Sequence, residues 1–105
     1  MITVRFFGQP EIRGFEVSGH SDFSEEGSDI VCAAVSSAAF MTANTVTDIL
    51  GVSPRLEVSD GYMLLNITTD EEIRRSQEIL RGFALHINAL YEQYQKYIKV
   101  INTEV

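Results

Sequence analysis

Residues 55–68 read Arg-Leu-Glu-Val-Ser-Asp-Gly-Tyr-Met-Leu-Leu-Asn-Ile-Thr, and this stretch decides the fold. Apolar residues alternate with other residues on both sides of Asp60-Gly61, at Leu56 and Val58 before it and at Met63, Leu65 and Ile67 after it. A period of two is typical of strands with one buried face, and Asp-Gly supplies the positive φ angles of a tight turn. The stretch therefore predicts a β-hairpin with strands at 55–59 and 62–68.

Three further strands are predicted outside this hairpin. Residues 2–7 and 13–18 are rich in β-branched and aromatic residues and are separated by Gly8-Gln9-Pro10, so they predict two strands joined by a turn. In the second of these strands, Phe15 and Val17 share one face. Residues 98–102 predict a closing strand.

Two helices are predicted between the strands. The first has Ser28 or Asp29 as its N-cap, ends at Gly51, and carries apolar residues at helical spacing: Val31, Val35, Ala38, Ala39, Val46, Ile49 and Leu50. The second begins near Thr69 or Asp70, and its apolar stripe contains Ile73, Leu80, Phe83, Ala84, Ile87, Leu90, Tyr91 and Tyr94. The order ββαββαβ predicts an α+β fold, with two helices packed on a mostly antiparallel sheet in a single domain, residues 1–105.

Composition narrows the classes of function. The chain has 105 residues, of which 45% are hydrophobic and 22% charged, as expected for one globular domain. Its net charge of −7 repels phosphate backbones and attracts basic partners, so nucleic acid is not an expected ligand. No cluster has zinc-ligand spacing and no glycine-rich loop has a phosphate-binding pattern, so we expect no metal and no cofactor.

The expected location is the cytoplasm. The chain has one cysteine, which excludes an internal disulfide, whereas small secreted domains usually need several. Residues 1–7 are too short and too alternating for a signal peptide, and no apolar run approaches the roughly 18 residues of a membrane span.

One pair of residues suggests chemistry. His20 opens a small, acidic loop at 19–28, and Cys32 is expected in the first turn of the first helix. A helix N-terminus carries unpaired N–H groups and a partial positive charge, which stabilise a thiolate. A neighbouring imidazole could take the thiol proton and return it to the leaving amine. The alternative is a buried structural cysteine, because the residues around Cys32 are apolar.

A resemblance to a known family rests on these residues. Gly19-His20, an acidic loop, and then Gly27-Ser28-Asp29-Ile30-Val31-Cys32-Ala33-Ala34-Val35-Ser36 resemble the ribosomal-processing cysteine protease family, Prp. The resemblance covers essentially the whole chain. It implies a cysteine endopeptidase that removes a short N-terminal extension from a large-subunit ribosomal protein by cutting after an aromatic residue.

Carried over to this sequence, the resemblance places the nucleophile on Cys32 and the proton-transfer partner on His20. Ser21 departs from the alanine expected there. Asp29 could orient the imidazole, although a role at the helix start is the simpler explanation. Ser36 lies one turn after Cys32 and could hydrogen-bond near the thiol, although a bond back to a helix carbonyl is the simpler explanation.

The loop at 21–28 is expected to order over bound peptide. Gly19 and Gly27 relax the backbone at its ends, and Phe23 is its apolar residue and a candidate latch. Glu25 and Glu26 are expected to face solvent, and His86 is expected at the surface or in a structural role. Tyr91, Tyr94 and Tyr97 are expected in the core or a dimer interface, because a chain of this size with exposed sheet edges favours a homodimer.

The second hypothesis is a non-catalytic binding or assembly module. In it, Cys32 is part of the core, and the acidic loop docks a basic ribosomal protein without catalysis. Both readings share an acidic protein and a basic partner.

Overall fold

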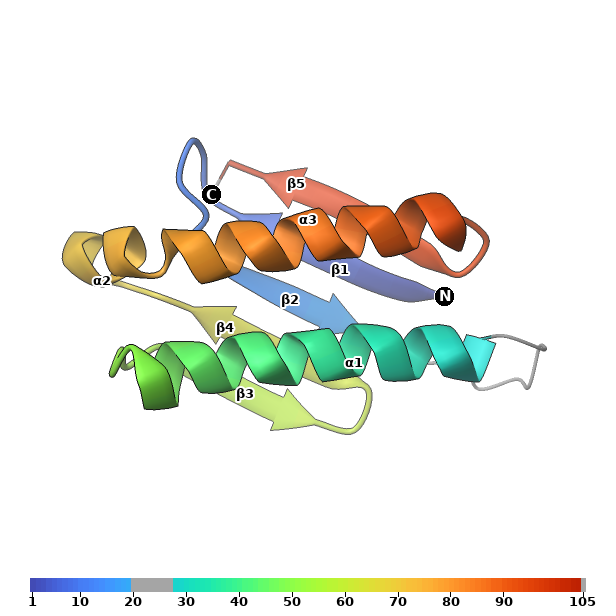
Figure 1. Ribbon diagram of the computed structural model, residues 1–105, viewed down its shortest axis with the longest axis horizontal. Helices are drawn as coiled ribbons and strands as arrows, with labels where there is room; N and C mark the ends of the chain where they lie inside the picture. The colour runs from blue at the N-terminus through green and yellow to red at the C-terminus, as the bar shows by residue number, and fades with distance from the viewer. Residues whose placement is uncertain (20–27, 105) are drawn as a thin grey trace.

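A five-stranded sheet carries two long helices on one face (Figure 1). The computed structural model describes residues 1–19 and 28–104, with Ser28 and Asp29 described by their backbone alone. The strands are β1 (Ile2–Phe7), β2 (Gly14–Ser18), β3 (Arg55–Ser59), β4 (Tyr62–Asn66) and β5 (Ile98–Thr103). They lie in the order β3-β4-β2-β1-β5. The predicted α+β fold is confirmed.

Three of the four strand pairs are antiparallel, as predicted, and one is parallel. β1 pairs with β2, β2 with β4, and β3 with β4 in the antiparallel sense, whereas β5 runs parallel to β1. In β2, Phe15 and Val17 are both buried, which confirms that they share the covered face. The sheet is therefore mixed, and its two edges are β3 and β5.

The β3–β4 hairpin closes with Ser59 opposite Tyr62, as the sequence predicts. Of the two turn residues, only Gly61 has a positive φ, of 69°, so Asp60 does not take the left-handed conformation expected of it. β3 forms at the predicted residues, but all five of them are exposed, so the strand lacks the buried face that its alternation indicates. β3 is the outer edge of the sheet, so its apolar residues are only partly covered.

The first helix, α1, spans Ser28–Asn44 and continues as a π-helical segment, η1, at Thr45–Ile49. Ser28 and Asp29 are part of the helix and not its N-cap. In η1 the Leu50 amide donates to the Thr45 carbonyl at 2.9 Å, an i to i+5 bond. This wider turn shifts the helical spacing, so Ile49 is 78% exposed although the pattern predicted it to be buried.

The segment Ile30–Ile49 is long and apolar enough to cross a membrane by length and composition. This finding differs from the sequence analysis, which predicted no apolar segment of that length. In this structure, however, the segment packs on the sheet, and its residues Val31, Val35 and Val46 are fully buried. The core helix of a globular domain can have the same length and composition, so we assign Ile30–Ile49 to the core.

The predicted second helix is divided at Ser76 into α2 (Asp70–Arg75) and α3 (Gln77–Gln93). Thr69 is the N-cap of α2, and its side chain accepts a hydrogen bond from the Glu72 amide at 3.3 Å. At the break, the Gln77 side chain bonds both the N–H and the C=O of Ile12, at 3.0 and 2.6 Å. This contact ties the start of α3 to the chain that enters β2.

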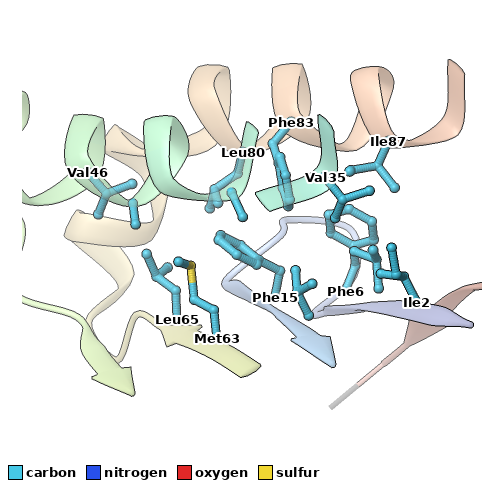
Figure 2. Packing of buried hydrophobic residues seen from close by; sticks show 14 of the residues in the cluster. Ile2, Phe6, Phe15, Val35, Val46, Met63, Leu65, Leu80, Phe83 and Ile87 are labelled. Atoms are coloured by element: carbon cyan, nitrogen blue, oxygen red, sulfur yellow. The ribbon is translucent and has the colours of Figure 1, made fainter. Parts of the chain in front are cut away.

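The core lies between the helices and the sheet (Figure 2). The Phe83 ring of α3 packs on Phe6 and Phe15 of the sheet, with ring centroids 5.7 and 4.5 Å apart. The stripe predicted for the second helix is confirmed, since Leu80, Phe83 and Ile87 are buried. These contacts hold α3 against β1 and β2.

Candidate active site

A pocket of about 280 Å³ lies between α1 and the turn end of the β3–β4 hairpin. Cys32, Ser36, Ala39 and Phe40 form its α1 side. Its other walls come from the end of β2 and from the hairpin: Val17, Gly19, Val58, Ser59, Asp60, Gly61, Tyr62 and Met63. Residues from four elements thus converge on the one thiol of the sequence.

Cys32 is half-buried and free, and it lies on the pocket side of α1. It is the fifth residue of the helix, so it begins the second turn rather than the first as predicted. This position changes the chemistry near the thiol, because the unpaired amides of a helix belong to its first four residues. Donors for an oxyanion would therefore come from the chain just before Cys32, and the dipole acts on the thiol from one turn away.

Gly19 lines the same pocket and is held in place by its backbone. Its φ is +92°, and its N–H donates to the Gly61 carbonyl at 3.0 Å. A Cβ at this position would lie 2.4 Å from the carbonyl oxygen of Met1, so only glycine fits. The residue that precedes His20 in the chain is therefore fixed at the pocket wall.

Ser36 lies one turn after Cys32 and lines the pocket as well, so the structure brings these two predicted residues together. Phe40 follows after one more turn and was missed by the sequence reading. The signal was available, because residues four and eight positions after Cys32 share its helix face.

Tyr62 is a second pocket residue that the sequence reading did not single out. Its hydroxyl donates to Glu16 at 2.8 Å, and Glu16 accepts from Arg5 at 3.1 Å. The hydrogen bond to Glu16, followed by burial, raises the pKa of Tyr62 above its ordinary value. A polar chain thus links the pocket wall to the open face of the sheet.

Several predicted site residues lie outside the described residues. They are His20, Ser21, Phe23 and Gly27, together with Glu25, Glu26 and the side chain of Asp29. The expectation for the loop at 21–28 therefore stays a prediction.

The remaining predicted residues lie apart from the pocket. His86 is exposed, beside a groove between α1 and α3, which confirms a surface position. Tyr91, Tyr94 and Tyr97 are half-buried against the core. Within the described part of the chain, no three His, Cys, Asp or Glu side chains gather as metal ligands would.

Comparison with known proteins decides the family. The sequence model of the family "Cysteine protease Prp" matches residues 1–99. The chain belongs to this family. As a Prp-family member it is a cysteine protease, and the hypothesis of a non-catalytic binding module is wrong.

Curated relatives match this chain over nearly its whole length. The ribosomal processing cysteine protease Prp of Bacillus subtilis is 29% identical over 103 residues, which cover 93% of this chain and 92% of the relative. That of Staphylococcus aureus is 27% identical over 105 residues, covering 95% and 97%.

Solved structures of similar proteins share the fold of this Prp-family chain. The S. aureus Prp in complex with a substrate peptide superposes with a TM-score of 0.87, at 24% identity, over 98% of this chain and 100% of that one. The same protease with a covalently linked product peptide gives a TM-score of 0.84 at 25% identity, with the same coverage. SMU.848 from Streptococcus mutans gives 0.81 at 28% identity over 98% and 94%.

Proposed function

We propose that this cysteine protease removes a short N-terminal extension from a protein of the large ribosomal subunit, by cutting after an aromatic residue. Cys32 is the nucleophile and His20 the proton-transfer partner. The observation that carries the proposal is that the only cysteine of the sequence opens onto a pocket large enough for a side chain. A cysteine protease needs a thiol, and this chain offers no other.

The proposed reaction has two stages. The Cys32 sulfur attacks the carbonyl carbon of the scissile bond while His20 takes the thiol proton. The tetrahedral intermediate collapses when the C–N bond breaks, and His20 gives the proton to the leaving amine. Water, deprotonated by His20, then hydrolyses the thioester and regenerates the free thiol. Support for His20 is its place in the sequence, directly after Gly19 at the pocket wall.

Asp29 and Ser36 are proposed as positioning residues. Ser36 lines the pocket with Cys32, and we propose that its hydroxyl hydrogen-bonds a group bound at the thiol. Asp29 precedes Cys32 by three residues on the helix, and we propose that it orients the His20 imidazole, as the third group of a triad does.

The substrate class is supported by charge and by the relatives. The relatives are named ribosomal processing proteases, and ribosomal proteins are typically basic. A net charge of −7 speeds encounter with such a target and repels free nucleic acid. A cytoplasmic location is part of the proposal, since ribosomal proteins are made there and a lone thiol stays reduced there.

The test is digestion of the extended ribosomal protein, read by intact mass. We expect one new species, shorter by the N-terminal extension and cut after an aromatic residue. A substrate with that aromatic residue changed to alanine is the matched control and should be cut at least tenfold more slowly. Cleavage at scattered sites, or none on a substrate made with its natural extension, would remove the assignment.

A further inference from the structure

The free edge of β3 lies beside the pocket that holds Cys32. Among residues 1–19 and 28–104, β3 is the outermost strand on its side of the sheet, and all five of its residues are exposed. Natural proteins usually protect such edges with proline, inward-pointing charges or a covering segment. Within β3 no proline occurs, and its two charged residues, Arg55 and Glu57, pair with each other at 2.9 Å.

The hairpin register shows which backbone groups face outward. A two-residue turn makes Ser59 and Tyr62 a hydrogen-bonded pair, and such pairs alternate with non-bonded ones along an antiparallel ladder. The N–H and C=O groups of Leu56 and Val58 therefore point away from β4, towards the free edge. No backbone hydrogen bond to either residue from outside the hairpin is found among the described residues.

The same two residues carry apolar side chains that remain partly open. Leu56 and Val58 pair with the buried Leu65 and Met63, so they lie on the helix side of the sheet. Their exposed fractions are 42% and 50%, and that of Phe40 on α1 is 47%. Val58 and Phe40 line the pocket together with Cys32. The strand edge is thus continuous with the candidate active site.

We propose that the polypeptide substrate binds as an added strand along the free edge of β3, with its backbone paired to Leu56 and Val58. Alternate substrate side chains then point towards the helix side, where Phe40 and Val58 accept an apolar residue. Strand addition to an edge is a general mode of peptide recognition, in which main-chain bonds give affinity and pockets for alternate side chains give specificity. This inference rests on the proposed function, because it concerns the same substrate.

Three observations favour a peptide as the occupant of this edge. The edge leads into the pocket of the single thiol, so a chain paired with it passes the nucleophile. The S. aureus relative was solved with a substrate peptide, and a peptide is the ligand that strand addition suits. Asp60 lies in the turn that follows β3, and the net charge of −7 complements a basic segment.

The first test is a scan of backbone N-methylation on a synthetic peptide that spans the processed junction. Affinity is measured for the Cys32→Ala protein, which separates binding from cleavage. N-methylation removes one N–H, so we expect about three- to tenfold weaker binding at every second position and little change at the positions between. A scan with no two-residue periodicity would overturn the proposal.

The second test places a proline at each edge of the sheet. Val58→Pro removes an outward N–H without touching the β4 ladder, so KM should rise about three- to tenfold with little change in kcat. Val100→Pro is the matched control. Its N–H also points outward, because the Ile2 and Gly8 amides donate to Tyr97 and Thr103, which places Val100 out of phase with the β1 ladder. KM of this variant should stay at the wild-type value.

The outcomes separate the two proposals. If wild type cleaves the peptide but neither the scan nor Val58→Pro shows an effect, strand addition is wrong and the proposed function stands. If wild type neither binds nor cleaves the peptide, the proposed function fails first. If Val58→Pro changes the molecular mass by light scattering and leaves KM unchanged, a second copy of the chain occupies the edge and the proposal is overturned.

Discussion

At the scale of single residues, Gly19 connects the strand that precedes His20 to the pocket wall. Its positive φ and its contact with the Met1 carbonyl leave no room for a side chain. Gly82 offers the opposite case, because a Cβ built there meets nothing within 4 Å. Alanine substitutions at the two positions therefore compare a site that requires glycine with one that has room for a side chain.

Gly19→Ala should lower the free energy of unfolding by about 1–3 kcal/mol, because alanine there needs a strained backbone and displaces Met1. Gly82→Ala should raise it by about 0.5–1 kcal/mol, since alanine favours the helix interior. Urea unfolding followed by circular dichroism measures both. Equal effects of the two substitutions would contradict the account of Gly19.

The candidate site was only partly predictable residue by residue. Cys32 and Ser36 were found because their residue types and helical spacing are visible in the sequence. Phe40 follows the same helical spacing and was overlooked, whereas Val58 comes from β3, which only the folded chain brings beside α1. The start of α1 was predicted one or two residues too late, because helix ends depend on local capping, and this placed Cys32 in the first turn.

At the scale of elements, the hairpin β3–β4 forms one wall of the site, and Tyr62 ties that wall to β2 and β1. The hydrogen bond from Tyr62 to Glu16 spans two strands, and the Arg5 contact extends it to a third. These two hydrogen bonds stabilise the end of the sheet at which the pocket opens.

Tyr62→Phe should lower the free energy of unfolding at pH 7 by about 0.5–1 kcal/mol, because the bond to a carboxylate is lost at a partly exposed position. The pKa of Tyr62 is raised in the folded protein, so its contribution is fully present below the ordinary tyrosine pKa of about 10. It is lost as pH rises through the raised value. Urea titrations of both proteins from pH 7 to 11 should therefore converge; a constant difference would contradict the prediction.

Strand and helix identities were predictable, whereas two features of the elements were not. Alternation and β-branched or aromatic composition predicted all five strands to within two residues, and helical spacing predicted the helical segments. The parallel pairing of β5 with β1 joins residues almost a hundred positions apart, which no local pattern encodes. The break at Ser76 depends on the contact of Gln77 with Ile12, which is also long-range.

At the scale of the whole molecule, the outer surface of the helix layer remains partly apolar. Ile30, Met41 and Leu85 are 65%, 53% and 76% exposed. We propose that a second copy covers part of this surface. Light scattering at micromolar concentration should then give about twice the 11.8 kDa of one chain. A mass near that of one chain would contradict a homodimer.

The central claim is that Cys32 and His20 form the catalytic pair, and turnover of three variants tests it most directly. Cleavage of the extended ribosomal protein is followed by intact mass for Cys32→Ala, His20→Ala and Ser37→Ala. Ser37 is the control, because it is exposed on α1 and does not line the pocket of Cys32.

With circular dichroism unchanged in all three variants, the first two should fall by at least about a thousandfold in kcat, since each removes a group that takes part in bond cleavage. Ser37→Ala should cleave at the wild-type rate. Wild-type turnover by either Cys32→Ala or His20→Ala would contradict the account.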